Sequence, residues 1–200
     1  MIVNYQKTIY LRMESKAKTH QILKIMHILT WIAVIGLIAQ AGAILISFTV
    51  SCFNPEAARN LYTGMDLEAT RSLNGVLDMY NLRQYSFRHY AMTVSFLLSV
   101  SLFKVYVLFL VTKTLSKVNL ASPFNYEVAH LIQTISYFLF STWLIAVIGN
   151  GYTSWLVKRT EFRLDQLPTS EFLFMAGLVF IISQIFKRGV EMQTESELTV

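Results

Sequence analysis

Residues 172–189 read FLFMAGLVFIISQIFKRG, and this stretch decides the class of fold. The 15 uncharged residues 172–186 are followed directly by Lys187 and Arg188. A chain that changes from apolar to doubly basic within two residues is leaving a lipid bilayer. A run of this length is shorter than the roughly 20 residues that cross the hydrocarbon as a helix. We therefore expect the helix to include residues 167–171, the bilayer to thin, or the two bases to extend toward the headgroups.

The composition of the whole chain agrees with a membrane protein. Of its 200 residues, 54% are hydrophobic and 14% are charged, which is too apolar for an ordinary soluble domain. Long apolar runs lie at about 28–50, 91–112, 132–157 and 168–186. Such runs must be helical in lipid, because hydrocarbon offers no hydrogen-bond partner to an open backbone. We predict an all-α membrane protein, one domain of residues 1–200, with four transmembrane helices.

The segments between these runs predict orientation and local structure. Lys and Arg are more numerous on the side that would hold both ends of the chain, so the N and C termini are predicted to be cytoplasmic. The basic residues 1–26 predict either a helix lying on the inner leaflet or a solvated tail. In the long outer loop 54–90, residues 66–77 predict a short amphipathic helix that caps the bundle.

Turn signals predict where the later helices begin and end. Ser122-Pro123 is typical of a helix start, and Pro168 before Thr169 and Ser170 marks a second one. Gly149-Asn150-Gly151 combines poor helix formers and is expected to loosen or end the third span early.

Among the polar residues inside the predicted spans, three form the candidate intramembrane site: Gln40, Lys104 and Gln184. Lys104 is the single basic residue within a span. Its long stem could carry the ammonium group to the headgroups, or the ammonium could pair with a buried polar group such as Gln40 or Gln184. The sequence leaves both alternatives open.

The sequence contains none of the common catalytic, phosphate-binding or metal-binding motifs. It contains no Gly-rich phosphate loop, no His-Glu-x-x-His, no Cys-x-x-Cys and no Gly-x-Ser-x-Gly, and Cys52 is its one cysteine. The four histidines fall outside the spans or at their edges, on both sides of the membrane. We therefore expect no catalytic residue, no metal, no cofactor and no enzyme activity.

Two segments resemble a known family. The segment Ser122-Pro123-Phe124 with Glu127, and the ending QIFKRGVEMQTESELTV of residues 184–200, are similar to the bacterial membrane family catalogued as domain of unknown function 2975. The similarity extends from about the second span to the C-terminus. It implies no particular activity. It does imply a partner, because genes of this family often neighbour a gene for a small helix-turn-helix regulator.

The expected function is that of a sensor or regulatory protein in the bacterial inner (plasma) membrane. The acidic cytoplasmic tail 189–200 and the connection before the third span would hold a basic regulator away from DNA, whose phosphates compete for the same charges. The docking residues are Pro123, Phe124, Glu127, Glu191, Glu195, Glu197, Leu198, Thr199 and Val200.

The sequence also allows other functions. A small solute transporter, channel or toxin-immunity protein would use Gln40, Lys104 and Gln184 together. The small residues Gly36, Ala39, Gly42 and Ala43 would allow close packing in a homo-oligomer or a larger complex. The net charge of +5 indicates anionic lipid, not direct contact with nucleic acid, as the reason for basicity.

Overall fold

A computed structural model describes residues 2–54, 57, 73–118, 125–160, 162 and 164–198. These residues form α1 (Ile2–Phe53), α3 (Leu73–Tyr85), α4 (Phe87–Lys117), α5 (Tyr126–Thr160) and α6 (Ser170–Leu198), without a strand in the described ranges. Four stretches are long and apolar enough to cross a membrane: Gln21–Phe53, Phe87–Lys117, Tyr126–Thr160 and Ser170–Glu195. The predicted all-α fold with four spans is confirmed, and the chain is a multi-pass membrane protein.

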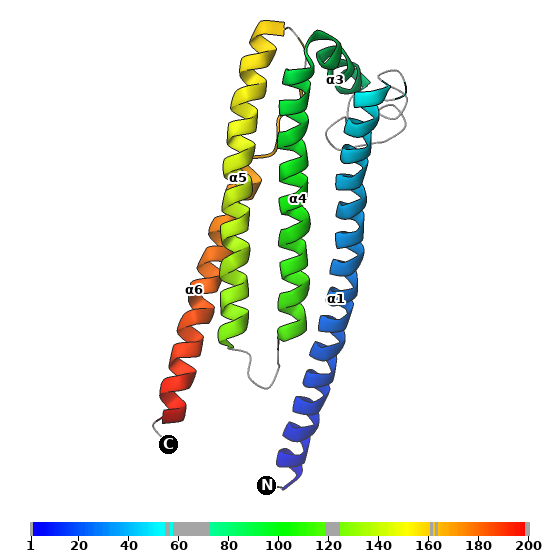
Figure 1. The fold of residues 1–200 in the computed structure, drawn as a ribbon. Helices are drawn as coiled ribbons and strands as arrows, with labels where there is room; N and C mark the ends of the chain where they lie inside the picture. Colours follow the sequence, from blue (N-terminus) through cyan, green and yellow to red (C-terminus); the bar gives the residue numbers. More distant parts are fainter. Residues whose placement is uncertain are drawn as a thin grey trace.

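The four long helices stand in the order α1, α4, α5 and α6. Each packs against the next one along this row (Figure 1). The two chain termini lie at one end of the molecule, which we call the terminal end. Helix α3 lies at the opposite end, which we call the α3 end (Figure 1).

Side-chain packing holds the row together at two levels. At the α3 end, Tyr90 and Leu82 are completely buried in a cluster with Ile44 and Leu156, which joins α1, α3, α4 and α5. A second cluster joins α4 to α5 nearer the terminal end and is formed by Leu110, Leu131 and Ile135. These clusters hold α4 against α1, α3 and α5.

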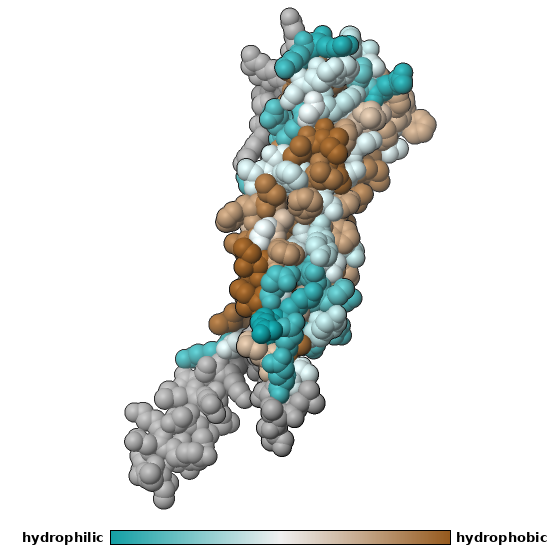
Figure 2. All heavy atoms as spheres, turned by 90° about the vertical axis from the view of Figure 1, so that its left-hand side faces the viewer, coloured by the Kyte–Doolittle hydropathy of each residue, from teal (hydrophilic) through white to brown (hydrophobic). Residues whose placement is uncertain are grey.

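The outer surfaces are apolar, as lipid contact requires. Ile35 on α1 is 63% exposed and Ile181 on α6 is 61% exposed, along with many other large apolar side chains. On the face shown in Figure 2, hydrophobic residues gather along the middle, and hydrophilic residues gather toward the α3 end and again lower down. A helix that is apolar on its outer side and carries polar ends is typical of a membrane span.

Helix α1 is longer than the sequence predicts. Its 52 residues run without a break from Ile2 to Phe53 and end directly before Asn54. The prediction of a separate helix lying on the inner leaflet is wrong, because residues 2–26 belong to the same unbroken helix as the first span. Gly36 and Gly42 face open space: a Cβ added at either position would meet no heavy atom of the described residues within 4 Å, so the described part of the chain does not pack against them.

The link between α1 and α4 contains α3. Its backbone is helical over residues 73–85, so it overlaps only the last part of the predicted helix 66–77. The earlier part, up to residue 72, lies outside the described residues. Ser86 is extended and separates α3 from α4. The Nε of Arg83 donates to the carbonyl oxygen of Ser51 at 2.7 Å, which ties α3 to the last turn of α1.

Helix α5 differs from the prediction at its start and in its middle. It begins at Tyr126, after Asn125, whose Oδ1 accepts the backbone N–H of Glu127 at 2.9 Å. This start comes later than the predicted one at Ser122-Pro123. The predicted interruption at residues 149–151 is wrong, because α5 continues through them to Thr160.

Candidate functional site

Helix α6 starts part-way along α5 instead of beside its end. After Thr160 the chain turns back and runs alongside α5 to the start of α6 (Figure 1). Asn150 holds this connection through two hydrogen bonds to the backbone of Leu167. Its Oδ1 accepts the Leu167 N–H at 2.7 Å, and its Nδ2 donates to the Leu167 carbonyl oxygen at 2.8 Å. Asn150 lies ten residues before the end of α5, which corresponds to about 15 Å along the helix.

This arrangement explains the short final apolar run. Non-helical backbone at membrane depth is tolerated only where protein or a polar cavity satisfies its hydrogen bonds. The Asn150 amide does so for Leu167 in the same way that a neighbouring backbone would. The apolar run 172–186 can therefore be short, because α6 begins part-way along α5 and not beside its end.

Gly149 provides the space for the connection. A Cβ at this position would lie 3.3 Å from the Cδ1 of Leu167 and 3.3 Å from the Cβ of Phe96. Gly149 and Asn150 thus form a docking point on α5, in which the first supplies room and the second supplies hydrogen bonds.

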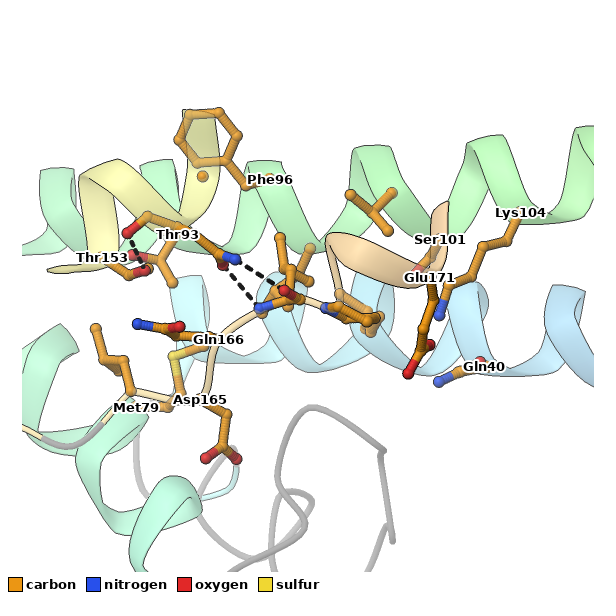
Figure 3. Close-up of a pocket in the computed structure, with 18 residues that line it drawn as sticks. Gln40, Met79, Thr93, Phe96, Ser101, Lys104, Thr153, Asp165, Gln166 and Glu171 are labelled. Carbon is orange, nitrogen blue, oxygen red and sulfur yellow. Dashed lines mark hydrogen bonds between the residues drawn. The ribbon is translucent and has the colours of Figure 1, made fainter. Parts of the chain in front are cut away.

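A cavity of about 500 Å³ opens where the connection meets the row of helices. Its walls come from α1, α3, α4, α5, the connection and the first turn of α6 (Figure 3). The polar side chains that line it are Gln40, Thr93, Ser101, Lys104, Asn150, Thr153, Asp165, Gln166 and Glu171. The apolar part of the lining includes Ile44, Leu97, Val100 and Leu167.

Lys104 points into this cavity. It lies near the middle of α4 and is half-buried. Its Nζ is 5.7 Å from the centroid of the Phe172 ring, a cation–π contact that places the ammonium group against the first turn of α6. Figure 3 shows the side chains of Lys104, Glu171 and Gln40 directed toward the same part of the cavity, from α4, α6 and α1.

The structure brings together two of the three predicted intramembrane residues. Gln40 and Lys104 share the cavity wall. Gln184 does not line the cavity; it is exposed on α6, and its Nε2 donates to the Oγ of Ser183 at 3.4 Å. Helical spacing on a single segment cannot show which faces of different helices converge, so the sequence did not separate Gln184 from the other two.

Glu171 is the functional candidate that sequence reasoning missed. Sequence reasoning placed residue 171 only at the start of the last helix and gave it no role in a site. The available signal was the length of the apolar run: an acid directly before a run too short to cross is expected at membrane depth. Asn150 was missed because its bonding partner is 17 residues away in the connection.

Only some of the predicted docking residues lie within the part of the chain that the structure describes. Glu127 pairs with Lys117 (Oε1 to Nζ, 3.2 Å), and Glu191 pairs with Arg188 (Oε2 to Nη1, 2.8 Å). Glu195 is exposed. Pro123, Phe124, Thr199, Val200 and the side chains of Glu197 and Leu198 lie outside the described residues. The backbone of residues 189–198 continues α6 as a helix instead of forming a separate tail.

Comparison with known proteins places the chain in a family. Residues 78–200 match the family model described as a protein of unknown function (DUF2975). No curated protein and no solved structure matches the chain. The matched range contains Lys104, Asn150 and Glu171, whereas Gln40 precedes it. Since the match covers more than half of the chain, and agrees with the resemblance of its ending, this protein belongs to the DUF2975 family of proteins of unknown function.

Proposed function

We propose that this protein is a sensor in the bacterial inner (plasma) membrane. In this proposal its cavity receives a small polar ligand, and the far end of α6 holds a small cytoplasmic helix-turn-helix regulator. The observation that supports it is the continuity of α6, a single helix of 29 residues. Glu171 in its first turn lines the cavity, and Glu191 and Glu195 lie in its last turns. Glu195 follows Glu171 by 24 positions, which corresponds to about 36 Å along the helix.

A continuous helix is a suitable connection between two sites. Helices that shift as rigid units by about 1–2 Å carry many allosteric transitions. The start of α6 is held by the connection that Asn150 binds, and its length packs against α5. A ligand that changes the contacts of Glu171 would therefore move the acidic end relative to α5.

The acids at the terminal end are suited to exchange partners. The side chains of the Lys117–Glu127 pair are 47% and 49% exposed, and those of the Arg188–Glu191 pair are 68% and 57% exposed. Exposed ion pairs contribute little to stability, because water and salt screen them. A basic regulator can replace the intramolecular bases at little cost, and DNA phosphates would compete for the same regulator surface.

The test is co-purification in mild detergent with the helix-turn-helix protein encoded beside the membrane protein. We expect the double variant Glu191→Gln with Glu195→Gln to recover at least about tenfold less regulator, because it removes two charges without changing shape. Met192→Gln is the matched control, since Met192 is exposed in the same turns and carries no charge. Equal recovery by the double variant and the control would rule out docking at the acidic end.

The cavity also favours a second function, that of a small solute transporter, channel or toxin-immunity protein. The version of this alternative that requires Gln40, Lys104 and Gln184 in one site is not supported, because Gln184 lies outside the cavity. The alternative assigns no role to Glu191 or Glu195. Solute flux in proteoliposomes that the double variant leaves unchanged, together with equal regulator recovery, would favour it over the sensor.

A further inference from the structure

Opposite charges from two helices approach one part of the cavity. Lys104 comes from the middle of α4 and Glu171 from the first turn of α6, and both line the cavity. Figure 3 shows the two side chains directed toward each other, whereas the carboxylate of Asp165 points away from them. The contact between Lys104 and the ring of Phe172 fixes the ammonium group beside this turn.

The charge pattern restricts the ligand. A charge at membrane depth is costly unless it is paired, and breaking a pair by removing one partner leaves the other uncompensated. Glu171 is exposed and Lys104 is half-buried at the cavity, so a ligand with one charge that enters between them would compensate only one of the two. A ligand that carries both an anionic and a cationic group can satisfy both residues at once.

The remainder of the cavity favours an apolar body on that ligand. Val100 and Ile44, only 2% and 7% exposed, also line the cavity, together with Leu97 and Leu167. Ligand sites in proteins are mostly apolar, with a few polar groups that fix orientation. The volume of about 500 Å³ is ample for a small molecule of this kind.

We infer that the cavity binds a small zwitterion with an apolar body, of which an apolar α-amino acid is the simplest example. Its carboxylate is held by Lys104 and its ammonium group by Glu171. Asn150 positions the connection that brings Glu171 to the cavity and does not itself hold a charge. This inference rests on the proposed sensor function, because it names the class of ligand for the same site.

Two sets of probes with matched bodies test the inference on the purified full-length protein. The first set is leucine, 4-methylpentanoate and 3-methylbutylamine, which share one apolar body. Leucine carries both charges, 4-methylpentanoate carries the carboxylate alone, and 3-methylbutylamine carries the ammonium group alone. The second set is phenylalanine, 3-phenylpropanoate and 2-phenylethylamine. The midpoint of thermal unfolding is measured with each probe, since a ligand that binds the folded protein raises it. Equilibrium dialysis with radiolabelled amino acid gives the affinity directly.

We expect at least one of the two amino acids to raise the midpoint, and its two singly charged analogues to leave it unchanged at the same concentration. Lys104→Met and Glu171→Gln each weaken amino-acid binding at least about tenfold, and Gln184→Leu, outside the cavity, leaves it unchanged. The swapped variant Lys104→Glu with Glu171→Lys keeps both charges. It should bind the amino acid in the reversed orientation, even if the single variants fold poorly.

Three results would overturn the inference: no binding of either amino acid at about 10 mM, equal binding of a singly charged analogue, or unchanged binding by both single variants. These results are separable from failure of the sensor proposal. If no zwitterion binds but regulator recovery still depends on Glu191 and Glu195, only the ligand class is wrong. If recovery is independent of those acids, the sensor proposal fails whatever the cavity binds.

Discussion

Asn150 shows how one side chain can set the depth of a whole helix. Its amide bonds to both polar backbone groups of Leu167, and the first turn of α6 follows three residues later. Sequence reasoning assigned residues 149–151 to a break in α5, because Gly and Asn are poor helix formers in water. In lipid the backbone has no other partners, so the helix continues and propensity is overridden. The pairing with Leu167 could not be read from spacing, since it joins two different segments.

Replacing Asn150 by Leu should therefore lower the free energy of unfolding. The change leaves the Leu167 N–H and C=O without their partners, at a cost of about 2 kcal/mol. Gln166→Leu is the control, because Gln166 is exposed and donates one long bond, 3.4 Å, to Ser154. Unfolding in SDS titrations from mild detergent measures both. A loss of stability no larger for Asn150→Leu than for the control would show that the two hydrogen bonds to Leu167 are not needed.

The two glycines that flank Asn150 should respond differently to the same substitution. Gly149→Leu brings side-chain atoms against Leu167 and Phe96 and should cost about 2 kcal/mol. At Gly151 an added Cβ meets no heavy atom within 4 Å, so Gly151→Leu should be neutral or stabilising by less than about 1 kcal/mol. The same SDS titration compares them. Similar effects at both positions would contradict the close approach of the connection to Gly149.

At the scale of elements, the position at which α6 starts forms the cavity, because the connection and the first turn of α6 complete its walls. Apolar runs were sufficient to predict four spans, because length and composition decide whether a segment crosses lipid. The run 172–186 also indicated that the last span was unusual. What the sequence could not give was the depth at which α6 begins, which depends on the contact between Leu167 and α5. Glu171 was consequently not predicted to be part of the site.

Water should reach the connection but not the outer face of α6. In a Cys52→Ser background, a cysteine replacing Gln166 should react with a membrane-impermeant maleimide, because Gln166 lines the cavity and thiolates form in water. A cysteine replacing Phe180 should not react, although Phe180 is 42% exposed, because its surroundings are lipid. Labelling of both positions in intact membranes, or of Phe180→Cys alone, would contradict this placement of the cavity.

At the scale of the whole molecule, α6 connects two chemically different ends. The polar cavity lies toward the α3 end, and the exposed acids lie at the terminal end beside the chain terminus (Figure 1). Sequence reasoning predicted the acidic end and two of the cavity residues, but treated them as belonging to separate hypotheses. They become one hypothesis only because α6 is continuous from Ser170 to Leu198. The central claim is therefore coupling between the two ends of one helix.

The most direct test is to change the cavity and measure binding at the other end. We would determine the dissociation constant of the regulator for the full-length protein in nanodiscs, for Lys104→Met and for the control Gln184→Leu. Lys104→Met removes the cation that contacts the first turn of α6, so the coupling predicts regulator binding at least about fivefold weaker, within the range typical of allosteric sites. The control should bind as the unchanged protein does. An unchanged dissociation constant for a correctly folded Lys104→Met protein would contradict the account.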